Sequence, residues 1–230
     1  MKNTIIETFA KSDIVINDQQ AQKFLDLYNF MIEYNKNVNL TSITEFNDVV
    51  VKHFVDSILP FTMTDIPSNS CFIDVGTGAG YPGIPLIIFR PDLKGTLCDS
   101  LEKRCVYLRK VCAMLDISAE VVHSRGEELG KNYREAYDLV CARAVAALPV
   151  LTELCLPLVK IGGKFLALKS VNEGTESSEN SIRTLGGEIE KVVDYKLPNG
   201  DDRRLIIIRK ITHTPTKYPR SFAKISKKPL

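Results

Sequence analysis

Apolar positions follow two different patterns along this chain, and the change falls near residue 67. Before it, apolar residues recur at helical spacing. A first helix is predicted over residues 18–35, with Asn17 or Asp18 as its N-cap. A second is predicted over residues 47–59 and ends at Pro60. The apolar positions of the first helix are Phe24, Leu27, Tyr28 and Met31.

After residue 67, short apolar runs alternate with helical stretches. Strands are predicted at Cys71–Val75, Lys94–Asp99, Ala119–Ser124, Tyr137–Arg143 and Lys164–Ser170. The helices between them are predicted near 82–89, 102–115, 148–159 and 179–185. Two further strands, Ile189–Leu197 and Arg203–Lys210, flank a Gly-containing turn and predict a closing hairpin. Such alternation is typical of an α/β fold, in which helices cover both faces of a parallel sheet.

We therefore expect three parts in one compact unit: a helical portion (1–66), a ligand-binding sheet domain (67–211) and a tail (212–230). The tail region is basic, because residues 209–230 include seven Lys or Arg and no acid, although the net charge of the chain is only +2. Two interpretations stay open for the tail, namely contact with nucleic-acid phosphates and a solvated terminus.

Composition excludes several classes of protein. No apolar run is long enough for a membrane span or a secretory signal, so we expect a cytoplasmic protein. The six cysteines form no CxxC, and no histidine lies at a metal-ligand spacing from a pair of them. Reduced, structural thiols are expected, with no metal. Nothing in the sequence demands a dimer, and a monomer is expected.

The strongest local motif is the glycine-rich segment Asp74-Val-Gly-Thr-Gly-Ala-Gly-Tyr-Pro-Gly83, which follows the first strand. Glycines at every second position let the backbone turn tightly and approach a ligand closely. Residues 78–83 also fit the G-x-G-x-x-G fingerprint of dinucleotide sites. A nicotinamide-dependent oxidoreductase is therefore one reading of this loop.

Two features favour S-adenosylmethionine over a dinucleotide. We expect Asp74 to face the ligand, where a carboxylate repels a pyrophosphate and attracts a sulfonium or ammonium group. Pro82 and Pro85 lack N–H donors for a phosphate in the first helical turn. Asp99 ends the second strand and can accept the ribose hydroxyls of either cofactor. Gly126 and Glu127, after the third strand, can contact an adenine.

The motifs in this order resemble the bacterial 16S rRNA guanine-N7 methyltransferases, the family also called glucose-inhibited division protein B. HFVDS (His53–Ser57), DSLEKR (Asp99–Arg104) and ARAV (Ala142–Val145) are the most particular of them. The other matching segments are Asn39–Ile43, Asp74–Pro85, Arg125–Glu127, Ala167–Lys169 and Thr214–Arg220.

This resemblance implies a Rossmann-like S-adenosylmethionine-dependent methyltransferase fold, with a seven-stranded, mostly parallel sheet and an antiparallel last strand. It also implies methyl transfer to N7 of one guanine of 16S rRNA, in the free RNA or the small subunit. The cofactor positions it implies are Gly76, Tyr81, Gly126, Glu127 and Arg143. Asp74, Gly78 and Asp99 match the general methyltransferase motif. Candidate contacts to the RNA are Arg104, Lys169, Lys217 and Arg220.

The chemistry of guanine N7 agrees with what the sequence lacks. N7 carries a lone pair and no proton, so catalysis can rest on positioning without a general base. The chain has no [DN]-P-P-[YFW] motif for amine methylation after the fourth strand, and no signature supports Cys141 as a nucleophile. A non-catalytic rRNA-binding factor remains an alternative. The roles of His53, Asp56 and Ser57, which share a helical face, stay open between structure and RNA contact.

Overall fold

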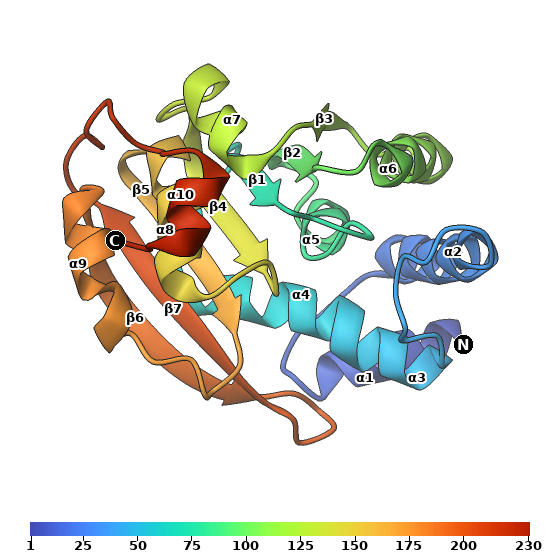
Figure 1. Cartoon of the computed structure of the whole chain (residues 1–230). Coiled ribbons are helices and arrows are strands. Elements are labelled where there is room, and N and C mark those ends of the chain that lie inside the picture. Colours follow the sequence, from blue (N-terminus) through green and yellow to red (C-terminus); the bar gives the residue numbers. More distant parts are fainter.

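A seven-stranded sheet forms the centre of the computed structural model, which describes all 230 residues (Figure 1). The strand order is β3-β2-β1-β4-β5-β7-β6. β7 is the one antiparallel strand, because it pairs antiparallel with both β5 and β6. This confirms the mostly parallel sheet with an antiparallel last strand. The strands are β1 (Cys71–Val75), β2 (Lys94–Asp99), β3 (Ala119–His123), β4 (Tyr137–Arg143), β5 (Val159–Lys169), β6 (Gly187–Lys196) and β7 (Asp202–Lys210).

Helices cover both faces of the sheet (Figure 1). One face carries α1 (Lys2–Ala10), α2 (Asp18–Asn35), α5 (Gly83–Phe89), α6 (Glu102–Leu115) and a continuous helical segment. That segment comprises α3 (Phe46–Val49), a π-helix (Val50–Val55), α4 (Asp56–Ile58) and a 3-10 turn (Leu59–Met63). The other face carries α7 (Gly126–Asn132), α8 (Leu148–Cys155), α9 (Glu179–Thr184) and α10 (Phe222–Lys227), with 3-10 turns at Leu156–Leu158 and Glu176–Ser178.

Strand residues alternate between two cores, as expected for a sheet buried on both sides. In β1, Phe72 belongs to a cluster of 38 buried residues and its neighbour Ile73 to a cluster of 22. The larger cluster includes Phe9, Phe24 and Phe54 from the N-terminal helices. These helices therefore share a core with the sheet.

Most predicted elements have the bounds that the sequence indicated, and the differences are local. The predicted helix over 47–59 is longer and contains the π-helix. β5 begins at Val159, five residues before the predicted start, and it includes Gly162, whose φ is +84°. Three short helices, α1, α7 and α10, were not predicted. No helix combines the length and the apolar character needed to cross a membrane.

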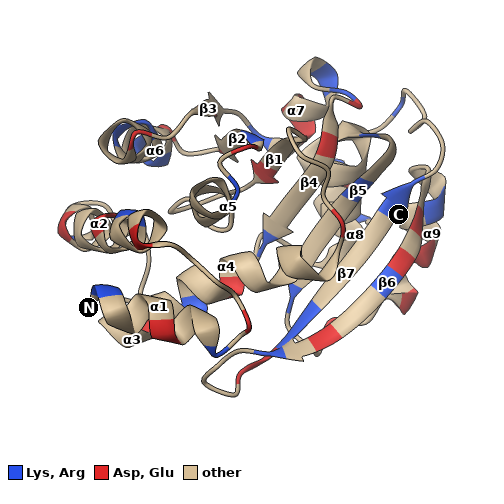
Figure 2. Ribbon diagram, turned by 180° about the vertical axis from the view of Figure 1, so that it is seen from behind, with Lys and Arg blue, Asp and Glu red and all other residues tan.

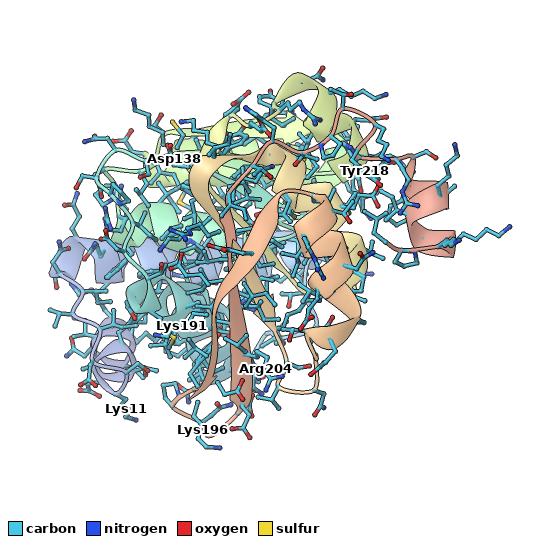
Figure 3. All side chains as sticks on the ribbon, turned by 90° about the vertical axis from the view of Figure 1, so that its left-hand side faces the viewer. Lys11, Asp138, Lys191, Lys196, Arg204 and Tyr218 are labelled. Atoms are coloured by element: carbon cyan, nitrogen blue, oxygen red, sulfur yellow. The ribbon has the colours of Figure 1, made fainter.

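Charged residues are spread over the surface (Figure 2). The β6–β7 hairpin carries several, and its tip near Lys196 extends away from the body of the molecule (Figure 3). The chain leaves β7 and passes Tyr218 before it reaches α10 (Figure 3).

Candidate functional site

Two adjoining cavities lie at the carboxyl ends of the parallel strands. The first, about 400 Å³, follows β1, β2 and β3, and the second, about 480 Å³, lies between β4, β5 and the π-helix. Ala144 lines both cavities and has a φ of +54°, which is rare outside glycine. A larger cavity of about 750 Å³ lies at the opposite edge, where the strands begin. Ligands of parallel α/β sheets bind at carboxyl ends near the point where strand order reverses, here between β1 and β4, so the adjoining pair is the candidate site.

The glycine loop forms one wall of the first cavity. The N–H groups of Gly76 and Thr77 both donate to the carbonyl of Cys98 at 2.9 Å, which ties the loop to the end of β2. Gly76 and Gly78 have φ values of +73° and +61°. A Cβ at position 76 would lie 2.7 Å from Cγ2 of Val145, so glycine is required there for both conformation and space.

Asp74 lies beneath the loop and does not face the first cavity, which corrects the sequence-based expectation. Its side chain is fully buried, and its Oδ2 accepts hydrogen bonds from Thr77 Oγ1 (2.6 Å) and from the N–H of Gly83 (2.8 Å). Burial raises the pKa of Asp74 to about 6, against the effect of these two donors. The carboxyl group therefore holds the glycine loop against the start of α5.

Asp99 lines the first cavity from the end of β2, as predicted. One carboxylate oxygen accepts the N–H of Gly78 at 3.0 Å, and the other accepts the N–H of Leu101 at 2.9 Å. Arg104, which we expected to contact RNA, lies in the same cavity with its Nη1 3.3 Å from Asp99 Oδ2. A carboxylate has about four lone-pair sites, so Asp99 keeps capacity for the hydroxyls of a ligand.

The far wall of the first cavity combines the predicted residues Gly126 and Glu127 with two apolar side chains. Leu154 of α8 lies 3.4 Å from the position of a Cβ on Gly126. Phe222, the first residue of α10, also lines this cavity, and it is 40% exposed. Phe222 had no signal in the sequence, because it lies 95 residues after Glu127 in a segment expected to be a tail.

Arg143 lies in the second cavity and does not line the first. From the end of β4, its Nη1 donates to the Lys52 carbonyl and to Asp56 Oδ2, both at 3.2 Å. Arg203 of β7 approaches the other carboxylate oxygen of Asp56, also at 3.2 Å. Burial raises the pKa of Asp56, and the two guanidinium groups oppose that shift.

Tyr81 and His53 stack face to face behind this cation. Their ring centroids are 4.4 Å apart with an interplanar angle of 16°, and the Arg143 guanidinium lies 5.3 Å from the Tyr81 ring. Burial, followed by the charge of Arg143, lowers the pKa of His53 to about 3, so the imidazole is neutral. Tyr81 is buried and lines neither cavity, and its hydroxyl has no partner. The structure therefore places Tyr81 behind His53, outside the first cavity.

The second cavity is rich in positive charge. With His53 neutral, its four cations outnumber Asp56 and Glu173 by two. Lys169, the predicted RNA contact, lines this cavity; its Nζ donates to the carbonyl of Ala146 and lies 3.5 Å from Glu173. Arg203 and Tyr195 come from the closing hairpin and were not predicted. The cations are Lys52, Arg143, Lys169 and Arg203.

The helical face of His53, Asp56 and Ser57 proves to border the second cavity through its first two residues. Ser57 Oγ donates to the carbonyl of His53 and accepts from Arg143 Nη1 at 3.4 Å, so it helps to hold the Arg143 side chain. Cys141 is fully buried, and burial raises the pKa of its thiol well above the ordinary value. A thiol in that state is a poor nucleophile. No group of three or more His, Cys, Asp or Glu side chains is placed to hold a metal ion.

Arg220 is engaged inside the protein, contrary to the expectation that it contacts RNA. Its Nε and Nη2 bind the carboxylate of Glu153 at 2.8 and 2.6 Å, and Glu153 is fully buried. Lys217 remains exposed, with its Nζ 5.2 Å from the ring centroid of Tyr218. Of the two predicted tail contacts, only Lys217 is available to a phosphate.

Comparisons with known proteins agree with this geometry. A family model described as rRNA small subunit methyltransferase G matches residues 20–206. A protein of that name from Acetivibrio thermocellus is 44% identical over 235 residues, covering 100% of this chain and 97% of its own. One from Staphylococcus saprophyticus is 47% identical, covering 94% and 93%. The solved structure described as "M. jannaschii TYW2 in complex with AdoMet" shares the fold, with a TM-score of 0.53 and 12% identity, covering 63% of this chain and 70% of its own.

Proposed function

The chain belongs to the rRNA small subunit methyltransferase G family, and from that premise we propose that it methylates N7 of one guanine in 16S rRNA. S-adenosylmethionine is the proposed methyl donor. The observation that carries the proposal is the pair of cavities that meet at Ala144. The first has backbone groups and the carboxylate of Asp99 at the end of β2, as in a nucleoside site, and the second has the positive charge suited to RNA.

The first cavity suits the cofactor. Gly76 leaves space that any side chain would fill, and Asp99 has carboxylate oxygens for the two ribose hydroxyls. Backbone groups of Gly126 and the side chain of Glu127 are proposed to contact the adenosyl part. Asp74 and Gly78 support these contacts by fixing the loop. When bound, the cofactor supplies an electrophilic methyl group.

The second cavity suits the guanine and its flanking phosphates. Arg143, Lys169 and Arg203 can donate to guanine O6 or to phosphate oxygens, and N7 stays free for the methyl group. Methylation of N7 leaves a positive charge on the base. A neutral His53 adds nothing to the four cations that oppose this change, and the carboxylates of Asp56 and Glu173 offset part of their effect. Catalysis then rests on positioning, because N7 has no proton to remove.

The RNA must expose its base to bring N7 to the methyl group, so we propose a looped-out guanine. Lys217 is placed to contact the phosphate backbone outside the cavity. An enzyme with this substrate acts in the cytoplasm. The substrate is proposed as 16S rRNA in the free or the subunit-bound form.

The test uses tritiated S-adenosylmethionine with 16S rRNA and with 30S subunits, both from a strain that lacks the gene. Tritium incorporation followed by chain scission specific for N7-methylguanine supports the proposal. RNA binding with a steep salt dependence but no incorporation would support the non-catalytic binding factor. A thermal shift with nicotinamide dinucleotides and none with S-adenosylmethionine would support the oxidoreductase.

A further inference from the structure

The C-terminal segment 211–230 is docked onto the body of the protein. Arg134 donates to the carbonyls of Thr214 and Tyr218, and Ile225 of α10 is fully buried in the smaller core. Contacts to the body of the protein therefore hold this segment both before and after residue 218. We call residues 211–230 the strap. Because it is packed, it can shape a site as well as contact phosphates.

A buried ion pair fixes the strap immediately before Phe222. The Arg220 N–H and Nε each donate to Glu153 Oε1 at 2.8 Å, and Nη2 donates to Oε2 at 2.6 Å. Glu153 is fully buried, so the pair is shielded from water and well defined in geometry. Glu153 belongs to α8, the helix that also supplies Leu154 to the first cavity. The ion pair therefore sets the distance between Leu154 and the start of α10.

The anchoring of the strap does not explain why an apolar side chain, Phe222, is exposed next to it. A phenylalanine that is 40% exposed on a packed segment gains little from its own burial. Its ring lines the first cavity together with Leu154, and both side chains come from helices on the same face of the sheet, α10 and α8. The polar residues Asp99 and Arg104 line the polar side of the cavity, from the end of β2 and from α6.

We propose that Phe222 covers the adenine ring of the bound cofactor, so that the strap completes the cofactor site. This inference rests on the proposed function, which places an adenosyl group in the first cavity. Aromatic rings stack favourably on nucleobases of any kind. The polar side is left for the ribose, and the Arg220–Glu153 pair acts as the positioning element for the ring.

Calorimetric titration with S-adenosylhomocysteine and with adenosine tests this proposal on the full-length protein. Phe222→Ala is expected to weaken the binding of both ligands about 10-fold, because both carry the adenine. Phe222→Tyr, which keeps the ring, should bind within about twofold of the unchanged protein. Ser226→Ala, at an exposed position of the same helix, is the matched control and should also bind normally.

Kinetics separate a role in binding from a general structural role. For Phe222→Ala the KM for S-adenosylmethionine should rise about 10-fold while kcat stays within about twofold, with an unchanged melting temperature of the ligand-free protein. Normal affinity of Phe222→Ala for S-adenosylhomocysteine, when the unchanged protein binds it, would overturn this inference alone. If the unchanged protein does not bind S-adenosylhomocysteine, the proposed function falls first and the inference falls with it.

Discussion

The two adjoining cavities are lined by different kinds of chemical groups. The first consists mainly of backbone and small residues at three successive strand ends, from Gly76 to Asp99 and Gly126. The second consists of charged side chains brought from the π-helix, β4, β5 and the closing hairpin. Arg143 and the Lys52 carbonyl it binds are 91 residues apart in the chain.

Because of this difference, we expect a substitution in the first cavity to act locally. A substitution in the second cavity should also affect the charged residues paired with it. A cavity lined by backbone loses its ligand when a side chain fills it, and the rest of the protein changes little. A network of paired charges redistributes when one member is lost, because each remaining charge keeps its desolvation cost.

The largest effect is expected from filling the first cavity. Gly76→Arg should abolish measurable binding of S-adenosylmethionine in calorimetry, because the new side chain meets Val145 and occupies the cavity. The protein should stay folded by circular dichroism. Gly162→Ala is the matched control: it has a similarly positive φ (+84°) and open space around it, so binding should be normal. Normal binding by Gly76→Arg would mean that the cofactor lies elsewhere.

Removing the central cation of the second cavity should affect turnover more than cofactor binding. Arg143→Met is expected to lower kcat about 100-fold through misplacement of the base, and to change the cofactor Kd less than threefold. It should also cost about 3 kcal/mol of stability, because Asp56 loses one of its two cationic partners. Arg209→Met, which removes an exposed pair with Glu188, should leave both kinetics and stability near normal. A raised cofactor Kd with unchanged kcat would reassign Arg143 to the first cavity.

Titration should distinguish the two regions by the sign of their effect on stability. Burial raises the pKa of Asp74 from 3.8 to about 6, so its contribution is full below pH 3.8 and is lost as the pH rises through 6. Burial lowers the pKa of His53 from 6.5 to about 3, so its contribution is present above pH 6.5 and is lost as the pH falls through 3.

Urea unfolding of Asp74→Asn and His53→Gln between pH 4 and pH 6 measures both contributions. As the pH rises, the unchanged protein should lose stability relative to Asp74→Asn and gain it relative to His53→Gln. Each slope should reach at most about 1.4 kcal/mol per pH unit, the value for one proton. Parallel curves for a variant and the unchanged protein would contradict the burial argument at that residue.

The smallest effect is expected at the surface. Lys217→Ala should weaken rRNA binding a fewfold and lower the slope of log affinity against log salt by about 1. Filter binding across 50–200 mM salt measures this slope. Lys36→Ala, on an exposed lysine of the N-terminal helices, is the control and should keep the full slope. An unchanged slope for Lys217→Ala would remove the strap from the RNA-binding surface.

The same contrast shows what the sequence could predict. β1, β2, β4, α2 and α6 have the predicted bounds, because periodicity and capping act within a few residues. Asn17, for example, forms a capping box with Gln20. The short helices α7 and α10 depend on tertiary packing, and they carry too few turns for a recognisable period.

Within the site, Gly76, Asp99, Gly126 and Glu127 of the first cavity were predicted, because each lies in a short motif directly after a predicted strand. The direction of a side chain was harder to predict: Asp74 lies near the end of β1 as expected, yet its carboxylate points under the loop. Contacts between residues far apart in the chain could not be predicted from the sequence. The Glu153 that binds Arg220 lies 67 residues earlier, and no local pattern relates the two.

Ala144 gives the molecule a thermodynamic property that neither cavity has alone. Ala144, whose backbone is strained, lies between the first and the second cavity. A shift of this residue caused by the occupant of one cavity therefore changes the wall of the other. Linkage then requires reciprocity: whatever factor an occupied cofactor cavity adds to RNA affinity, bound RNA adds to cofactor affinity.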